Sequence, residues 1–261
     1  MKAYHYSYCA SRAKKRNVLF VRFGEIFIII LDWTKPAFIG AMIGVCSMSV
    51  LSLTPSLFMK HSYEGESIQL LSDRVLADNS AEIISRAQKK IAVSELYRPD
   101  MKFKVYLCSQ HWKYLLASRF SINSKGIYIP FTDRIILDMQ CIAGNKDLVR
   151  CVAHEVTHAM VRNKLGWRSL VMPKWVSEGY AEYVAKGTWS NLDAESKLFQ
   201  LRSETVDHDD YGQYRMLVTY ALDAWRVPLD DLLRKPPATR KLIFAIQSQS
   251  MDRLLDSIVG S

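Results

Sequence analysis

Two histidines four residues apart, His154 and His158, have the spacing in this chain that most directly suggests chemistry. On a helix, residues four apart lie on one face, so both imidazoles can bind the same divalent metal ion. Glu155 follows the first histidine, where a carboxylate can accept a proton from a metal-bound water. The pattern predicts a metal-dependent hydrolase with one zinc ion per chain as its cofactor.

A second acidic segment offers the third ligand. Nineteen residues separate His158 from Glu178, which stands in the string Trp-x-x-Glu-Gly-x-Ala-Glu-Tyr over residues 175–183. Three protein ligands that leave a fourth position open for water are typical of a catalytic zinc site. Glu182 lies one helical turn further on the same face, where it can orient a ligand histidine. The alternative for Glu182 is a solvent-exposed helix glutamate.

These motifs resemble those of gluzincin metallopeptidases, the peptidase MA-like group, over about residues 80–235. The resemblance implies that His154, His158 and Glu178 bind the zinc and that Glu155 is the general base. Aminopeptidases of the M1 type carry a similar string with a spacing one residue shorter. Thermolysin-like enzymes have a similar spacing with different residues around the glutamate. The exopeptidase motif of the M1 enzymes has no clear match here, which favours an endopeptidase.

The reaction also needs a hydrogen-bond donor for the tetrahedral oxyanion, in addition to the metal. Gluzincins often supply a tyrosine from a helix that follows the third ligand, and Tyr211 matches this pattern best. Tyr214 is the second candidate. His208 is the third, because thermolysin-like enzymes use a histidine for this purpose. A surface or packing role remains the alternative for each of them.

Two helices must position the ligands. The spacing of apolar residues predicts the first helix over 146–165, with Asn145 as its N-cap, Asp147 in its first turn and Gly166 at its end. A second helix, predicted over 174–186, carries the third ligand. Both predictions place the candidate ligands on regular, rigid elements.

Strands precede these helices and further helices follow them. Alternating apolar and polar residues predict strands over 102–108, 126–129 and 134–137. Other helices are predicted over 79–95, 110–118, 196–203, 212–226 and 228–234, with two more over 238–258. This order favours an α+β, zincin-like fold with a small, mostly antiparallel sheet, the active-site helix and a helical C-terminal part. Ile127-Tyr128-Ile129 is the candidate sheet edge for a peptide substrate.

The N-terminal part predicts a membrane anchor. Residues 36–58 contain no charged side chain and are long enough to span a bilayer. Residues 1–35 hold seven Lys and Arg against two acidic residues, which gives +5 of the chain's net charge of +9. The positive-inside rule therefore predicts a basic cytoplasmic segment over 1–35, a transmembrane signal anchor over 36–58, a linker with a short helix over 59–78 and the peptidase domain over 79–261.

This arrangement predicts a single-pass protein of the cell (inner) membrane with an extracytoplasmic, periplasmic catalytic domain. A cleaved signal peptide is the alternative, although no clear Ala-x-Ala site follows the apolar run. Because the anchor explains the basic excess, no nucleic-acid partner is expected. Outside the cytoplasm, a disulfide between Cys141 and Cys151 would be permitted.

Three functions fit the motifs to different degrees. The favoured one is a membrane-anchored zinc endopeptidase that hydrolyses a peptide or protein substrate. The second is a catalytically silent peptidase-like domain that binds a peptide or protein partner, and the intact motif residues weigh against it. The third is an intramembrane metalloprotease. The charges of Arg150, Arg162 and Lys164 weigh against it, because they flank the His154–His158 motif too closely for its helix to lie within lipid.

Overall fold

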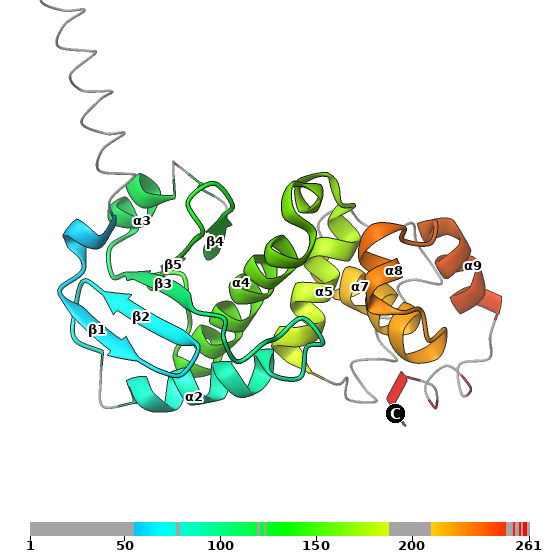
Figure 1. Cartoon of the computed structure of the whole chain (residues 1–261), viewed down its shortest axis with the longest axis horizontal. Coiled ribbons are helices and arrows are strands. Elements are labelled where there is room, and N and C mark those ends of the chain that lie inside the picture. Colours follow the sequence, from blue (N-terminus) through cyan, green and yellow to red (C-terminus); the bar gives the residue numbers. More distant parts are fainter. Residues whose placement is uncertain are drawn as a thin grey trace, which may run out of the picture. The chain divides into compact units, whose positions relative to one another are not determined.

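The computed structural model describes residues 55–76, 79–118, 121–122, 124–187, 210–248, 253, 256, 258 and 259. They all belong to one compact unit, Ser52–Ser261, with an α+β fold (Figure 1). Most of the expected membrane span lies outside the described residues, as do His208 and the helix expected over 196–203. The last four residues of that span form a short 3-10 helix, η1 (Pro55–Phe58). Among the described helices, none combines the length and apolar character needed to cross a membrane.

The described part of the chain contains a five-stranded sheet in the order β1-β2-β3-β5-β4. Its strands are β1 (His61–Glu64), β2 (Ile68–Ser72), β3 (Phe103–Cys108), β4 (Gly126–Ile129) and β5 (Arg134–Asp138). The two outer pairs are antiparallel, whereas β2–β3 and β3–β5 are parallel. The sheet is therefore mixed, and the expectation of a mostly antiparallel sheet is wrong. Helical crossovers between these strands allow the parallel pairing.

The segment 59–78, expected to be a linker with a short helix, instead contributes β1 and β2 to the sheet. Ile68 and Leu70 of β2 are fully buried, so this strand is part of the core. The turn between the strands packs closely on the following helix, because a Cβ at Gly65 would lie 2.3 Å from Ile84 Cγ2. The domain therefore begins before residue 79.

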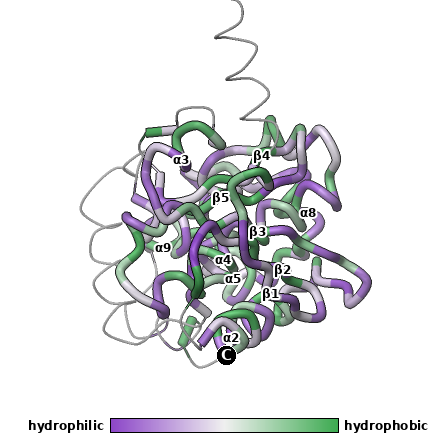
Figure 2. Tube along the Cα trace, turned by 90° about the vertical axis from the view of Figure 1, so that its left-hand side faces the viewer, coloured by the Kyte–Doolittle hydropathy of each residue, from purple (hydrophilic) through white to green (hydrophobic). Residues whose placement is uncertain are grey.

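Helices cover both faces of the sheet. One face, with Val105, Leu107 and Leu137, packs against α2 (Ser80–Ile91) and α4 (Asn145–Leu165) in the main hydrophobic core. The other face packs against α3 (His111–Ala117) through a smaller cluster that includes Ile136 and Tyr114. Figure 2 shows apolar and hydrophilic stretches alternating where β3 and β5 lie. The alternation of side chains along the strands produces these two layers.

The remaining described elements are helical and lie on the far side of α4 from the sheet (Figure 1). They are η2 (Gly166–Val171), α5 (Lys174–Lys186), α7 (Tyr211–Thr219), the π-helical turn η3 (Tyr220–Ala224), α8 (Leu229–Arg234) and α9 (Thr239–Ser248). Helix α5 packs between α4 and α7. The two helices predicted for the ligands are confirmed with ends that differ by at most one residue.

The ends of α4 differ in how well they were predicted. Gly166 ends the helix with a φ of 59°, as expected. Asn145 is not the N-cap but the first helical residue, and Gly144 with a φ of 82° precedes it. This left-handed conformation suits glycine, which has no Cβ to clash. Cys141 and Cys151 are both free, so the disulfide between them is not formed.

Asp73 joins the ends of two strands to helix α3. Its carboxylate accepts hydrogen bonds from the Ser109 backbone N–H at 2.9 Å, the Ser109 hydroxyl at 2.9 Å and Lys113 Nζ at 2.7 Å. Burial alone would raise the pKa of Asp73, but these bonds outweigh it and lower the pKa below its ordinary value. The ionised carboxylate is therefore part of the folded structure.

We expect Asp73→Ala to lower the free energy of unfolding by about 2–3 kcal/mol at pH 7, because it removes charge-assisted hydrogen bonds. The contribution of a lowered pKa is present above the unfolded-state value of about 3.9 and is lost as the pH falls through the folded-state value. The difference between wild type and variant in urea unfolding should therefore shrink below about pH 4. Asp100→Ala, whose side chain is 74% exposed, is the control. Equal unfolding of both variants would contradict this role.

Candidate metal centre

Helices α4 and α5 bring together three atoms of a kind that can bind a metal ion. His154 Nε2 lies 3.2 Å from His158 Nε2 and 3.2 Å from Glu178 Oε2, and His158 Nε2 lies 3.5 Å from Glu178 Oε2. Two ligands of one tetrahedral ion with bonds of about 2.0–2.1 Å are separated by about 3.4 Å. The three predicted ligand residues thus form a triangle that could hold one divalent cation.

The position of Glu178 depends on tight packing around α5. A Cβ at the next residue, Gly179, would lie 2.4 Å from the Tyr214 carbonyl oxygen of α7. Trp175 and Val176 are buried on the same helix, and the Tyr180 hydroxyl hydrogen-bonds to Ser94 Oγ at 2.7 Å. The glycine of the Trp-x-x-Glu-Gly string therefore allows α7 to pack closely on α5, which in turn packs on α4.

Glu182 lies where an orienting residue is required. Its Oε1 is 3.2 Å from His154 Nδ1, and its Oε2 is 2.5 Å from Lys186 Nζ. The Glu182 carboxylate therefore lies beside Nδ1 of the His154 ring, while Nε2 of the same ring is one corner of the ligand triangle. Ser177 Oγ lies 3.4 Å from Nδ1 of His158, so it stands next to His158 as Glu182 stands next to His154. Sequence reasoning missed Ser177, because a serine beside a ligand carries no signal of its own.

The side chain of His154 and the carboxylates of Glu178 and Glu182 shift one another's pKa values. Burial alone would lower the pKa of His154, but contacts with Glu178 and Glu182 outweigh it and raise this pKa to about 10. Burial likewise would raise the pKa of Glu182, but His154 and Lys186 lower it to about 2. The pKa of Glu178 is lowered for the same kind of reason, by both histidines. The carboxylates thus create a site that attracts positive charge.

Glu155 lies between the triangle and the sheet edge. Its side chain is buried, and a Cβ at Gly126 of β4 would lie 3.2 Å from both its Cγ and its Oε1. Burial is the largest influence on Glu155 and raises the pKa of its carboxyl, although the charges of His154 and His158 and a hydrogen bond from the Tyr128 backbone oppose this. A raised pKa makes a carboxylate a better proton acceptor near neutral pH.

An open cavity of about 320 Å³ connects these residues. Its lining includes the three ligand residues, Glu155, Tyr211 and the backbone segment 126–128 of β4. A second cavity of about 440 Å³ shares Gly126, Glu155 and Tyr211 and extends along α4 toward Arg150. Among the strands that the structure describes, β4 pairs with β5 alone, so the predicted sheet edge over 127–129 is confirmed as an outer strand beside the site.

Tyr211 and Tyr214 differ in their relation to the cavity. Tyr211 begins α7, is 40% exposed and lines both cavities, and its ring centroid lies 6.3 Å from that of His154. Asp210 caps this helix by accepting the backbone N–H groups of Gly212 and Gln213 at 2.8 and 3.1 Å. Tyr214 is buried in the core and is not part of the lining of either cavity. Of these two candidates, Tyr211 is the one that faces the ligands.

Comparisons with known proteins give no family for this chain. No protein-family model matches it, and no curated protein matches its sequence. The likeness to gluzincin metallopeptidases rests on the residues of the two motifs.

We expect Glu182→Gln to weaken zinc binding at the triangle by about 10–100-fold, because an amide orients the His154 ring less well and does not raise its basicity. Competition with a coloured chelator at pH 7 measures this change. Glu82→Gln on α2 is the matched control, since the Glu82 side chain is 64% exposed. If both variants bind zinc as tightly as wild type does, Glu182 has no orienting role.

Proposed function

We propose that this protein is a zinc-dependent peptidase of the gluzincin type that acts as an endopeptidase on peptide or protein substrates. The observation that carries the proposal is the ligand triangle beside a buried carboxylate and an outer strand, all on one open cavity. Two imidazole nitrogens and one carboxylate oxygen are a donor set that catalytic zinc sites use. A zinc ion in this place would polarise a substrate carbonyl and lower the pKa of a water molecule.

Glu155 is the proposed general base. Its buried carboxyl, with a raised pKa, lies beside the ligand triangle on the side of strand β4. There it accepts a proton from the attacking water and later passes the proton to the leaving amine nitrogen. Because the same carboxyl group both accepts and donates the proton, its pKa must lie closer to neutrality than the pKa of a solvated glutamate.

Strand β4 is the proposed binding surface for the substrate backbone. An extended peptide can add to an outer strand through main-chain hydrogen bonds, with alternate side chains facing the protein. A peptide on β4 would run along the cavity beside Glu155, because Gly126 and Tyr128 line that cavity. This geometry accepts a chain that continues in both directions, which favours internal cleavage.

Tyr211 is the proposed donor to the oxyanion. Its place at the start of α7, with an exposed side chain that lines the cavity, leaves the phenol accessible to a bound substrate. A preorganised donor of this kind stabilises the charge that develops on the carbonyl oxygen.

The proposed location is the outer face of the inner membrane, with the N-terminal segment as a single-pass anchor. The apolar run over 36–58 and the basic excess over 1–35 support it.

The decisive experiment compares wild type with Glu155→Gln on an unbiased peptide library. We expect wild-type protein to cleave internal bonds and the variant to lose hydrolysis while it keeps its zinc, because glutamine cannot accept the proton. Zinc content and cleavage products are measured on the same preparations. Wild-type protein that binds zinc and cleaves no peptide would favour the silent, partner-binding domain. Wild-type protein that folds and binds no zinc would overturn the proposal.

In the same assay, we expect Tyr211→Phe to lower kcat by about 10²–10³-fold with little change in KM, as for the loss of one oxyanion donor. Tyr214→Phe is the matched control, because it removes the hydroxyl of a buried tyrosine on the same helix. Equal loss of kcat in the two variants would point to a packing effect and would contradict the role of Tyr211.

A further inference from the structure

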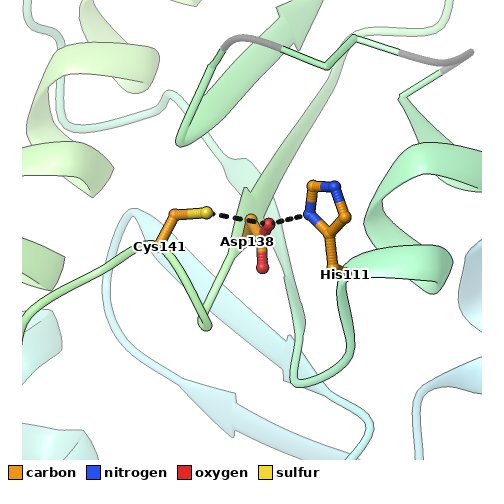
Figure 3. Close-up of side chains that lie close together, drawn as sticks. All are labelled: His111, Asp138 and Cys141. Atoms are coloured by element: carbon orange, nitrogen blue, oxygen red, sulfur yellow. Dashed lines mark hydrogen bonds and ion pairs between the residues drawn. The ribbon is translucent and has the colours of Figure 1, made fainter.

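A second group of metal-ligating side chains lies at the carboxyl end of β5. His111 at the start of α3, Asp138 at the end of β5 and Cys141 in the loop before α4 point toward one another (Figure 3). Asp138 Oδ2 lies 2.5 Å from His111 Nδ1 and 3.3 Å from Cys141 Sγ. The three ligand atoms all lie within 4.8 Å of one another.

The sheet topology explains why these residues meet. Strands β3 and β5 are parallel neighbours, and Cys108 is opposite Asp138 in their register. The segments that follow the two strands therefore leave the sheet at the same edge. His111 and Cys141 each lie three residues beyond this Cys108–Asp138 pair. The convergence is thus a property of the fold and not of a flexible surface.

The Asp138 carboxylate is held in place more firmly than an ordinary surface acid. Its side chain has no exposed area, and its Oδ1 accepts the Gln140 backbone N–H at 3.0 Å. Within the part of the chain that the structure describes, His111 is the one basic side chain within ion-pair distance of it. A buried carboxylate needs a counter-charge, and a metal ion can provide one.

We propose that His111, Asp138 and Cys141 form a second site for a divalent metal ion of the zinc type. Imidazole, carboxylate and thiolate are all zinc ligands, and the two negative charges of Asp138 and Cys141 balance one divalent ion. The His111–Asp138 distance is shorter than the separation of about 3.4 Å for two ligands of one ion, so the ring must rotate slightly as the metal displaces the proton between these two groups. The thiol proton that Cys141 donates to Asp138 leaves to solvent when the thiolate binds. His111 is 39% exposed and Cys141 is exposed, so the ion and a water ligand can enter from solvent.

The proposed second site would link α3 to the loop that leads into α4, the helix with His154 and His158. The bound ion would fix the start of this loop relative to the sheet. The zinc content would then exceed one ion per chain. The proposal rests on the His111–Asp138–Cys141 geometry alone and does not depend on peptidase activity.

Cobalt(II) binding to the reduced, metal-free, full-length protein tests this proposal. A thiolate ligand gives a charge-transfer absorption in the near ultraviolet, whereas the His154–His158–Glu178 triangle contains no thiol and gives none. We expect this band in wild type, its loss in Cys141→Ser, and at least tenfold weaker cobalt binding in His111→Ala. The band should persist in Cys151→Ser, the matched thiol control, and in the double variant His154→Ala/His158→Ala.

Three results for the absorption band would overturn the second site. They are the absence of the band in wild type, an unchanged band in Cys141→Ser, and loss of the band in the double variant. Unchanged cobalt binding in His111→Ala would show that His111 is not a ligand, and this would also contradict the proposed site. Urea unfolding of the metal-free Cys141→Ser protein, compared with metal-free wild type, shows whether the variant still folds, and the exposed position of Cys141 predicts that it does.

Discussion

The packing of α5 against α4 places Glu178 Oε2 within 3.2 Å of His154 Nε2 and 3.5 Å of His158 Nε2, and the rest of the site depends on this contact. Buried acidic and basic groups at such distances must neutralise one another or share a cation. Two features support the contact from outside. Gly179 lets α7 approach α5 closely, and Glu182 Oε1 lies 3.2 Å from the Nδ1 atom of His154. Tertiary packing thus holds the side chains of His154, His158 and Glu178 close to one another.

The candidate metal ligands and the candidate base contact different elements of the fold. The triangle lies on two helices, whereas Glu155 also contacts the outer strand β4 through Gly126. A substrate that adds to this strand would therefore approach the carboxylate and the metal position from one direction. Tyr211 faces the same cavity from α7. Residues of α4, α5, α7 and β4 thus converge on one open cavity.

Local sequence patterns predicted the site more accurately than they predicted the sheet. His154, Glu155 and His158 lie within one helical stretch, so their spacing determines their common face. The parallel pairing of β2 with β3 depends on contacts between residues far apart in sequence, and the short strand Ile68–Ser72 carried no clear alternation. The cluster of His111 with Asp138 was missed for the same reason, because only the β3–β5 register brings them together. Long-range register is the information that a single sequence does not display.

The central claim is that His154, His158 and Glu178 hold one metal ion. The most direct test is an anomalous difference map at the zinc absorption edge, from crystals of protein supplied with zinc. We expect a strong peak at about 2.0–2.2 Å from His154 Nε2, His158 Nε2 and a Glu178 carboxylate oxygen. A protein that crystallises with the same fold and shows no zinc peak among these three side chains would contradict it.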